Sequence, residues 1–525
     1  MDSQVLDIAR AYDEVPYTSR PFAQTQPQRL AASARLFGLA PPDVETARVL
    51  ELGCAAGGNI IPLAMQFPEA DFTGVDLSGQ QIGHGVARLA HLGLKNIRLV
   101  THSIADITRG FGKFDYIICH GVYSWVPAHV RDAIMRVSSE NLNPNGIAYV
   151  SYNVYPGWRL RTVLRDAMMF HGNLGATPAE RVARARAFLN LLSSTTNAQT
   201  AYGQMLRHEA QALTGFEDAY VTHEYLELNN EPCYVKDFLK RLDVFDLAFL
   251  TEADFPLTIA ENFGAETGAL LRTLSENRLD RMEQYIDFLT GRSFRQSLLV
   301  RKEQAAKIQR TLSPENLRGL HVSTRVSPEY QTLGDGRFQF SDPAGRTLTT
   351  SSSIVCERIA DLARHAPATA TLEDLTKDLA TEVSASGDSD PQAVNDVKHA
   401  LFNMVLAGIA DISTTPVALR PAIAAQPIAL PIARSDAGTG MTWTTNARHE
   451  TVTLDAVQRV LLPLLDGTND RAALMQELRE RVQKGDITFN RDGSPLVDQR
   501  EISNAIDEHV TLALNAFQRA LLLAA

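Results

Sequence analysis

Residues 49–59, VLELGCAAGGN, combine an acidic side chain with a run of small residues and three glycines. Gly53, Gly57 and Gly58 allow the backbone to come close to a bound molecule, because glycine has no side chain. The apolar residues before Gly53 predict a strand that is buried on both faces, and those from Asn59 onward predict a helix. The N-terminus of a helix attracts negative charge, such as a carboxylate. The stretch therefore predicts a strand, a tight turn and a helix around a small ligand.

A second acidic residue indicates the kind of ligand. Asp76 ends the next predicted strand, residues 71–76, about twenty residues beyond the turn. A carboxylate in that position accepts hydrogen bonds from the two hydroxyl groups of a ribose. A dinucleotide-binding fold requires the spacing G-x-G-x-x-G, whereas residues 53–58 read GCAAGG. The pattern E-x-G-x-x-x-G followed by G-x-D-x-S instead resembles class I S-adenosylmethionine (AdoMet) methyltransferases. The alternative is a glycine turn in an unrelated α/β protein.

Three further side chains stand where the resemblance places the methyl-donor sulfur of AdoMet. His120 ends the predicted strand of residues 114–120, and Tyr123 and Trp125 follow it. Open α/β sheets bind their ligands at the carboxyl ends of parallel strands. We therefore expect these three side chains to shape the channel for the methyl acceptor. A purely structural histidine is the alternative for His120.

The loop predicted at residues 220–232 carries two acid–base candidates, His223 and Glu224. A lysine acceptor must lose its proton before it attacks a methyl group. Either a desolvated, aromatic-lined channel selects the neutral amine, or a base removes the proton. We expect this loop to act as a gate beside the active site, with His223 and Glu224 as the weaker catalytic candidates.

The resemblance implies contacts along the whole length of AdoMet. The methionine part would lie near the glycine turn, the ribose at Asp76 and the adenine beside Ser103. Members of the class usually have an acidic residue at the position of Ser103, and Asp106 can replace it only if the loop is shifted. The expected cofactor-binding residues are Tyr17, Glu51, Gly53, Ala55, Gly57, Asn59, Asp76, Leu77, Gln81, Ser103, Ile104 and His120.

Residues 1–47 form a leader that is aromatic and irregular at first and has a helical pattern from residue 28 to residue 39. In class I methyltransferases such a leader often closes over the cofactor. Tyr12, Tyr17 and Arg20 are the candidates for contact with the methionine carboxylate. For each of them, a place in a packed N-terminal arm is the alternative.

The alternation of strands and helices with short links predicts a doubly wound α/β fold. We expect a Rossmann-like class I methyltransferase sheet with a helical insert, followed by an α+β C-terminal half with winged-helix-like modules. In that half, residues 323–350 predict one small sheet, and residues 407–412 predict a strand like that of a wing hairpin. The expected domains are an N-terminal arm or lid (1–47), an AdoMet-binding core (48–160), a helical insert for dimerisation or substrate (161–232), the completion of the methyltransferase sheet (233–302), a middle domain (303–415) and a C-terminal winged-helix-like domain (432–525).

Composition narrows the class of partner and the compartment. The chain has 525 residues and a net charge of −11, which argues against nucleic acid as the main partner. No apolar run approaches the roughly 20 residues of a membrane helix, and the N-terminal residues have no signal-peptide pattern. The four cysteines are scattered without metal-ligand spacing. We therefore expect a cytoplasmic protein with no disulfide bonds and no metal site.

Taken together, the motifs resemble one group within the class. They include LELGCAAGGN at residues 50–59, GVDLS at 74–78, HGVYSWVP at 120–127, VSYNVYPGW at 150–158 and NARHE at 446–450. The chain resembles bacterial methyltransferases that carry a methyltransferase regulatory domain, a group that includes rickettsial protein-lysine methyltransferases. The resemblance implies AdoMet as the methyl donor, a protein substrate methylated on lysine, a helical dimerisation region that forms a homodimer, and further domains around an open cavity.

Two other functions remain open from the sequence. One is a small-molecule methyltransferase whose C-terminal half serves only assembly. The other is a degenerate AdoMet-binding protein that acts as a partner module. The intact Glu51, Gly53 and Asp76 argue against this last alternative.

Overall fold

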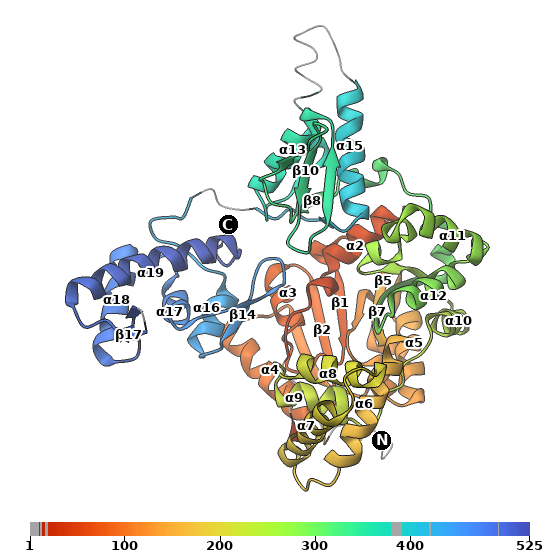
Figure 1. Ribbon diagram of the computed structural model, residues 1–525, viewed down its shortest axis with the longest axis horizontal. Helices are drawn as coiled ribbons and strands as arrows, with labels where there is room; N and C mark the ends of the chain where they lie inside the picture. Colours follow the sequence, from red (N-terminus) through yellow and green to blue (C-terminus); the bar gives the residue numbers. More distant parts are fainter. Residues whose placement is uncertain are drawn as a thin grey trace.

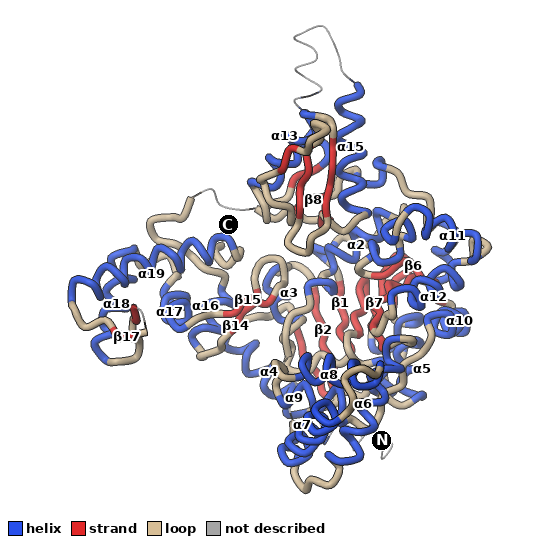
Figure 2. The backbone as a smooth tube through the Cα atoms, in the orientation of Figure 1, coloured by secondary structure: helices blue, strands red, loops and turns tan. Residues whose placement is uncertain are grey.

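The computed structural model describes residues 10, 13–15, 19–377, 379, 391–418, 422–491 and 493–524. A seven-stranded sheet with the order β3-β2-β1-β4-β5-β7-β6 lies at its centre (Figures 1 and 2). Strands β1 to β5 are parallel, and β7 is antiparallel to both of its neighbours. This arrangement confirms the predicted Rossmann-like sheet. Its strands are β1 (Arg48–Leu52), β2 (Asp71–Asp76), β3 (Ile97–Thr101), β4 (Phe114–Cys119), β5 (Leu142–Asn153), β6 (Leu247–Glu252) and β7 (Phe294–Arg301).

Both faces of the sheet are covered. Successive residues of a strand point to opposite faces, and Val49 and Leu50 of β1 accordingly belong to two different buried clusters. One face packs against α2 (Pro27–Leu36), α3 (Ile60–Gln66) and α4 (Gly79–Leu92), and the other packs against α5 (Ala128–Glu140) and α10 (Val235–Val244). Two further helices, α11 (Ala265–Ser275) and α12 (Leu279–Thr290), lie between β6 and β7 in the chain. The near-continuous apolar runs of β1 and β4 follow from this double burial.

Local signals set the bounds of α4. The side chain of Ser78 accepts a hydrogen bond from the backbone N–H of Gln81 and so caps the first turn, while Gly93 ends the helix with a left-handed φ of 67°. Serine is a favoured N-cap residue, and glycine takes the left-handed conformation with little strain. Because the cap follows directly after Asp76, it also fixes the backbone beside that acid.

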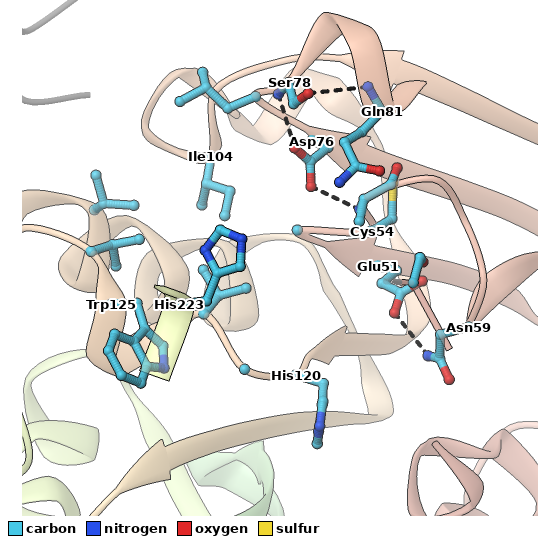
Figure 3. A pocket seen from close by; sticks show the side chains of 18 of the residues that line it. Glu51, Cys54, Asn59, Asp76, Ser78, Gln81, Ile104, His120, Trp125 and His223 are labelled. Carbon is cyan, nitrogen blue, oxygen red and sulfur yellow. Dashed lines mark hydrogen bonds between the residues drawn. The ribbon is translucent and has the colours of Figure 1, made fainter. Parts of the chain in front are cut away.

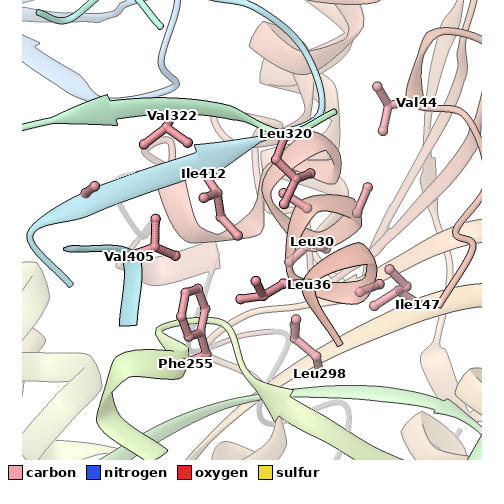
Figure 4. Packing of buried hydrophobic residues seen from close by; sticks show 14 of the residues in the cluster. Leu30, Leu36, Val44, Ile147, Phe255, Leu298, Leu320, Val322, Val405 and Ile412 are labelled. Atoms are coloured by element: carbon pink, nitrogen blue, oxygen red, sulfur yellow. The ribbon is translucent and has the colours of Figure 1, made fainter. Parts of the chain in front are cut away.

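The predicted leader helix is confirmed as α2, and it lies deep in the protein. Its residues Leu30 and Leu36 are buried together with Ile147 and Leu298 of the central sheet. Figure 4 shows Leu30 and Leu36 of α2 between the central sheet and a group of residues from the chain after β7, namely Leu320, Val322 and Ile412. The central sheet and the middle part of the chain therefore share one hydrophobic core.

The middle part of the chain contains the small sheet predicted within residues 323–350 and a second small sheet. It contains two three-stranded sheets, with the orders β12-β8-β13 and β11-β10-β9. The strand predicted at residues 407–412 is present as β13, but it pairs antiparallel with β8 and not with a neighbouring strand of a wing hairpin. The elements are β8 (His321–Thr324), β9 (Gln331–Thr332), β10 (Phe338–Ser341), β11 (Thr347–Thr350), α13 (Ser353–Arg364), β12 (Ala370–Thr371), α15 (Pro391–Leu406) and β13 (Ala410–Ser413).

The helical insert follows β5 and has a small core of its own. His223 does not lie in a loop, as predicted, but in a π-helical turn, Thr222–Leu226, that continues α9. Tyr225 and Leu226 of this turn are buried against the other insert helices, so the packing of the insert holds the turn in a helical form. The insert helices are α6 (Gly157–Gly172), α7 (Pro178–Thr195), α8 (Ala201–Leu213) and α9 (Asp218–Val221).

The C-terminal part is a helical unit with two short hairpins and a separate hydrophobic core. An ion pair of 2.5 Å between Arg88 of α4 and Asp436 of α16 joins it to the central domain. Its elements are α16 (Pro431–Gly438), β14 (Trp443–Thr445), β15 (Thr451–Thr453), α17 (Ala456–Leu461), α18 (Arg471–Lys484), β16 (Asn490–Arg491), β17 (Ser494–Pro495) and α19 (Gln499–Arg519). Across the described residues, no helix combines the length and the apolarity that a membrane span requires.

Candidate functional site

A cavity of about 240 Å³ opens at the carboxyl ends of β1, β2, β3 and β4. Figure 3 shows Asp76 and Ser78 at one end of it, His120 at the other, Glu51 and Asn59 along one side, and Trp125 on the opposite side. The strand order reverses between the neighbouring strands β1 and β4. Open α/β sheets bind ligands at such a point. The expected site residues that line the cavity are Arg20, Glu51, Gly53, Ala55, Asn59, Asp76, Leu77, Gln81, Ser103, Ile104, His120, Trp125, His223 and Glu224.

Hydrogen bonds join the turn after β1 to the acid at the end of β2. The backbone N–H of Ala55 donates to Oδ2 of Asp76 at 2.8 Å, and that of Ser78 donates to Oδ1 at 2.9 Å (Figure 3). Burial raises the pKa of Asp76, and the backbone N–H donors oppose that rise. Each carboxylate oxygen has two lone pairs, so Asp76 retains acceptor sites for the hydroxyls of a ribose in the cavity.

The glycines of the turn have different tasks. Gly53 has a φ of 76° and lines the cavity, and a Cβ at this position would lie 2.5 Å from Cγ2 of Val122. Gly57 has a φ of 77° but does not line the cavity. A Cβ at this position would lie 2.9 Å from the side chain of Ile61, which is not among the lining residues either. The predicted contact of Gly57 with the cofactor is thus replaced by a role in the conformation of the turn.

Glu51 and Asn59 form a buried polar pair on one side of the cavity. Nδ2 of Asn59 donates to Oε1 of Glu51 at 2.8 Å, and burial raises the pKa of Glu51 to about 8. Oε2 of Glu51 is buried and has no hydrogen-bond partner among the described residues. A buried polar atom without a partner is costly, and the amino group of a methionine moiety would provide one. The hydrogen-bond acceptors of the cavity therefore fit AdoMet at both its ribose and its amino-acid part.

His120 closes the cavity with an aromatic group. Its Nδ1 lies 2.8 Å from the Tyr149 hydroxyl, and its ring centroid lies 3.8 Å from that of Phe22 and 5.9 Å from that of Phe294. Burial lowers the pKa of His120 to about 3. The ring is therefore neutral near pH 7, and His120 contributes an uncharged aromatic wall.

Trp125 and Tyr123 separate at the turn after β4. Trp125 lines the cavity, whereas Tyr123 turns away from it and packs against Tyr152 and Phe238, with ring centroids 6.0 and 5.5 Å away. The 3₁₀ turn Tyr123–Trp125 causes this separation, because its residues point in different directions. The expectation that Tyr123 shapes the acceptor channel is therefore not met by its position.

The helical insert contributes His223 and Glu224 to the cavity. Nε2 of His223 lies 2.8 Å from the carbonyl oxygen of Val15, and Nδ1 lies 3.1 Å from a carboxylate oxygen of Glu227. Both ring nitrogens therefore face acceptors, so the geometry suits a residue that holds the arm more than a base. Burial raises the pKa of Glu224 to about 7, while the nearby Arg161 and His223 oppose the rise. Glu224 is consequently the better proton acceptor near neutral pH.

The loop after β3 provides Ser103 and Ile104 to the cavity. The hydroxyl of Ser103 accepts a hydrogen bond from the backbone N–H of Ala105 at 3.3 Å. Asp106 is exposed and does not line the cavity, so it does not replace the acidic residue of the class.

Several cavity residues were not predicted from the sequence. The N-terminal arm covers the cavity with Ser19 and Phe22, and Oγ of Ser19 accepts a hydrogen bond of 2.7 Å from the backbone N–H of Gly58. Gly58 was part of the predicted turn, and its need for close backbone approach was the available signal. Tyr12 and Tyr17 lie outside the described residues. The other unpredicted lining residues are Cys54, Ser78, His102, Gly121, Val122, Val126, Pro127, Val130 and Phe294.

Within the described residues, no group of three or more histidine, cysteine or acidic side chains is arranged to hold a metal ion.

Comparisons with known proteins agree with this geometry. Residues 50–148 match the family described as "Methyltransferase domain", residues 217–301 match "Predicted methyltransferase regulatory domain", and residues 425–522 match "PKMT, C-terminal winged helix domain". The protein RP789 of Rickettsia prowazekii is 33% identical over 519 residues, which cover 96% of this chain and 92% of that protein. The protein RP028 of the same organism is 42% identical over 232 residues, which cover 44% of this chain and 93% of that protein.

A solved structure extends the likeness to nearly the full chain. PKMT2 from Rickettsia typhi in complex with AdoHcy has a TM-score of 0.84 and 29% sequence identity, and the match covers 97% of this chain and all of that one. A second structure of PKMT2 from Rickettsia typhi gives a TM-score of 0.85. The cavity, the sheet and the match to RP789 together show that the chain belongs to the family of AdoMet-dependent methyltransferases that carry a regulatory domain and a PKMT C-terminal winged helix domain.

Proposed function

We propose that this methyltransferase transfers the methyl group of AdoMet to the side-chain amine of a lysine in a protein. The observation that carries the proposal is the position of Glu224 in the same cavity as Asp76 and Glu51. An amine must lose a proton before methylation, and a carboxyl group with a pKa of about 7 is suited to accept it at neutral pH. The resemblance to PKMT2 supports a protein substrate.

In this mechanism, the residues of the chain bind AdoMet, orient the acceptor amine and exclude water from the cavity. Asp76 would accept from the ribose hydroxyls, and Oε2 of Glu51 would accept from the amino group of the methionine part. The rings of His120, Phe22 and Phe294 form an uncharged aromatic wall that keeps the acceptor desolvated. When bound, AdoMet supplies a methyl group on a sulfonium sulfur that the lysine nitrogen displaces in line. Orientation of this kind can contribute roughly 7–11 kcal/mol to lowering the barrier.

Glu224 takes the proton. Its carboxylate accepts one proton from the lysine ammonium, so that the nitrogen lone pair is free to form the new bond to carbon. The carboxyl group then releases the proton to solvent. The raised pKa of Glu224 supports this role, because a base with the ordinary carboxylate pKa would be too weak to accept a proton at pH 7.

The test is transfer of a tritiated methyl group from AdoMet in a bacterial lysate. Proteins and small molecules are separated after the reaction, and labelled proteins are hydrolysed to amino acids. The proposal predicts label in methylated lysine and none when an Asp76→Ala variant replaces the enzyme. Pre-acetylation of the lysate proteins should also abolish the label. Label confined to the small-molecule fraction, or to an amino acid other than lysine, would contradict the proposal.

A homodimer through the helical insert is part of the same proposal. The insert exposes large apolar side chains, among them Leu160 at 59%, Phe170 at 77% and Leu174 at 64%. Exposed apolar groups of this size are typical of protein–protein contacts. Light scattering should report a dimer for the wild type and a monomer for Phe170→Asp, while Val497→Asp, at an exposed apolar position of the C-terminal part, should remain dimeric. A monomeric wild type would contradict the proposed dimer.

We also propose a cytoplasmic location and no direct role for nucleic acid. All four cysteines are free, which suits a reducing compartment. The net charge of −11 opposes binding to a phosphate backbone. Fractionation of the cells that produce the protein, followed by immunodetection, tests the location directly. Recovery in the periplasm or outside the cell would contradict it.

A further inference from the structure

A side chain of the C-terminal part of the chain reaches Asn59, the N-cap residue of α3 after the glycine turn. The loop between β14 and β15, residues 446–450, places His449 against Asn59, and Nε2 of His449 lies 2.8 Å from Oδ1 of Asn59. His449 is buried, with 1% of its surface exposed, although 390 residues separate it from its partner in the sequence. In Figure 1, β14 accordingly lies beside α3, the helix that Asn59 precedes.

Asn59 connects this contact to the rest of the site by several hydrogen bonds. Its Oδ1 also accepts hydrogen bonds from the backbone N–H of Phe22 at 2.9 Å and from the hydroxyl of Thr25 at 3.1 Å, while its Nδ2 donates to Glu51. Because a backbone N–H only donates, the side facing Phe22 must be the carbonyl oxygen. Nε2 of His449 faces this same oxygen and therefore carries the hydrogen. Burial lowers the pKa of His449 to about 3, so the ring is neutral and has one N–H to give.

The loop that carries His449 is held in place from within. Oδ1 of Asn446 accepts hydrogen bonds from the backbone N–H groups of Arg448 and Glu450, each at 2.9 Å. His449 itself has a left-handed φ of 58°. Residues other than glycine adopt this conformation at an energetic cost, and such positions are concentrated at functional sites. The backbone of the loop is thus shaped to present this one side chain.

The same loop is also anchored to its surroundings. Arg448 forms an ion pair of 2.6 Å with Asp411 of β13, and Asp411 is also paired with Arg29 of α2. Close by, the guanidinium of Arg20, which lines the AdoMet cavity, lies 5.6 Å from the ring centroid of Trp443 in β14. The C-terminal part therefore contacts both the turn below the cavity and the arm that covers it.

We propose that His449 is a positioning residue for AdoMet. It fixes the Asn59 amide, and through that amide it sets the position of the Glu51 carboxyl and of the arm at Phe22. The His449–Asn59 contact and the occupation of the cavity are then coupled, and each favours the other to the same extent. This inference rests on the proposed assignment of the cavity to AdoMet. It adds that a residue of the C-terminal part controls how tightly AdoMet binds.

The test compares three variants of the full chain by calorimetric titration with AdoHcy. His449→Leu removes the donor, His449→Gln restores an N–H donor on a side chain of similar length, and Arg88→Gln loosens the same interface at Asp436 without touching Asn59. We expect AdoHcy to bind about tenfold more weakly to His449→Leu, because Oδ1 of Asn59 then keeps only two of its three donors and the amide beside Glu51 is held less firmly. His449→Gln and Arg88→Gln should bind within about threefold of the wild type.

The possible outcomes distinguish the role of His449 from the assignment of the cavity to AdoMet. Equal binding by His449→Leu and the wild type would overturn the role of His449 alone, and so would equal losses in all three variants. Absence of binding to the wild type would overturn the AdoMet assignment itself. If His449→Leu does not fold, hydrogen exchange of the wild type decides: AdoHcy should slow exchange in residues 443–453, and unchanged exchange there would overturn the coupling.

Discussion

The backbone N–H of Ala55 donates a hydrogen bond of 2.8 Å to the carboxylate of Asp76. This contact ties the glycine turn after β1 to the acid at the end of β2, so the two motifs form one structure. The N–H of Ser78 binds the second oxygen of the same carboxylate at 2.9 Å and begins the cap of α4. The acid therefore sets the shape of the cavity as well as offering acceptors to a ligand.

The first prediction concerns Asp76. Asp76→Asn should weaken AdoHcy binding by about 30-fold, because the ribose and the Ala55 N–H lose a charged acceptor, which is typically worth roughly 1.5–3 kcal/mol. Asp71→Asn is the matched control, since Asp71 is exposed at the other end of β2. Calorimetry on both variants checks the prediction. An Asp76→Asn variant that binds as tightly as the control would contradict it.

The second prediction is a pH dependence set by Glu224. Its pKa is raised to about 7, so the group holds its proton below that pH and cannot act as a base there. The ratio of wild-type to Glu224→Gln activity cancels the titration of the acceptor lysine. This ratio should rise about tenfold per pH unit up to pH 7 and then level off near 100.

A constant ratio across pH 5.5–8.5 would contradict the role of Glu224 as the base. Glu231→Gln provides a control, because Glu231 is an exposed carboxylate paired with Arg131 and does not line the cavity. Its activity relative to the wild type should not change with pH.

The third prediction concerns the aromatic wall. His120→Ala removes the ring that lies 3.8 Å from that of Phe22, so the turnover rate should fall by about tenfold or more as water enters and the acceptor loses its orientation. AdoHcy binding should change by less than about threefold. Initial rates at saturating AdoMet, together with calorimetry, measure the two effects separately. A loss confined to AdoHcy affinity would show that His120 acts on the cofactor and not on the acceptor.

The fourth prediction tests the cover of the cavity. A Cβ at Gly58 would overlap the carbonyl oxygen of Ser19, so Gly58→Ala should displace the arm and lower stability by about 2 kcal/mol. Gly83→Ala is the control, because a Cβ at this exposed position in α4 meets nothing within 4 Å. This substitution should stabilise the protein by roughly 0.5–1 kcal/mol.

Thermal denaturation with and without AdoHcy measures both effects. The Gly58 variant should also lose most of the stabilisation by AdoHcy, because Ser19 and Phe22 line the cavity. A Gly58→Ala variant that melts as the wild type does and responds equally to AdoHcy would contradict the role given to the arm.

Sequence reasoning succeeded where a local signal fixes the structure. The apolar run before Gly53 predicted the strand that is observed as β1, and the strand predicted at residues 71–76 is observed as β2 with the same bounds. Asp76 was placed correctly beside the glycine turn because strand, turn and helix lengths leave it little freedom. These features depend on residues within a few positions of one another.

Sequence reasoning failed where direction or distance decides. Tyr123 was expected in the cavity because it follows β4, but one 3₁₀ turn is enough to point its ring at Tyr152. The contacts of Ser19 with Gly58 and of His449 with Asn59 join segments 39 and 390 residues apart. Nothing in the local pattern of either partner encodes such a pairing, so these two contacts came only from the structure.

The most direct measurement of the central claim is a crystal structure of the protein with AdoHcy. We predict that the ligand occupies the cavity between Glu51 and His120, with its ribose hydroxyls at hydrogen-bond distance, about 2.5–3.0 Å, from the carboxylate of Asp76. Its adenine should lie beside Ile104 and its amino group against Oε2 of Glu51. A structure in which AdoHcy binds elsewhere, or leaves Asp76 and Glu51 without contact to it, would contradict the account.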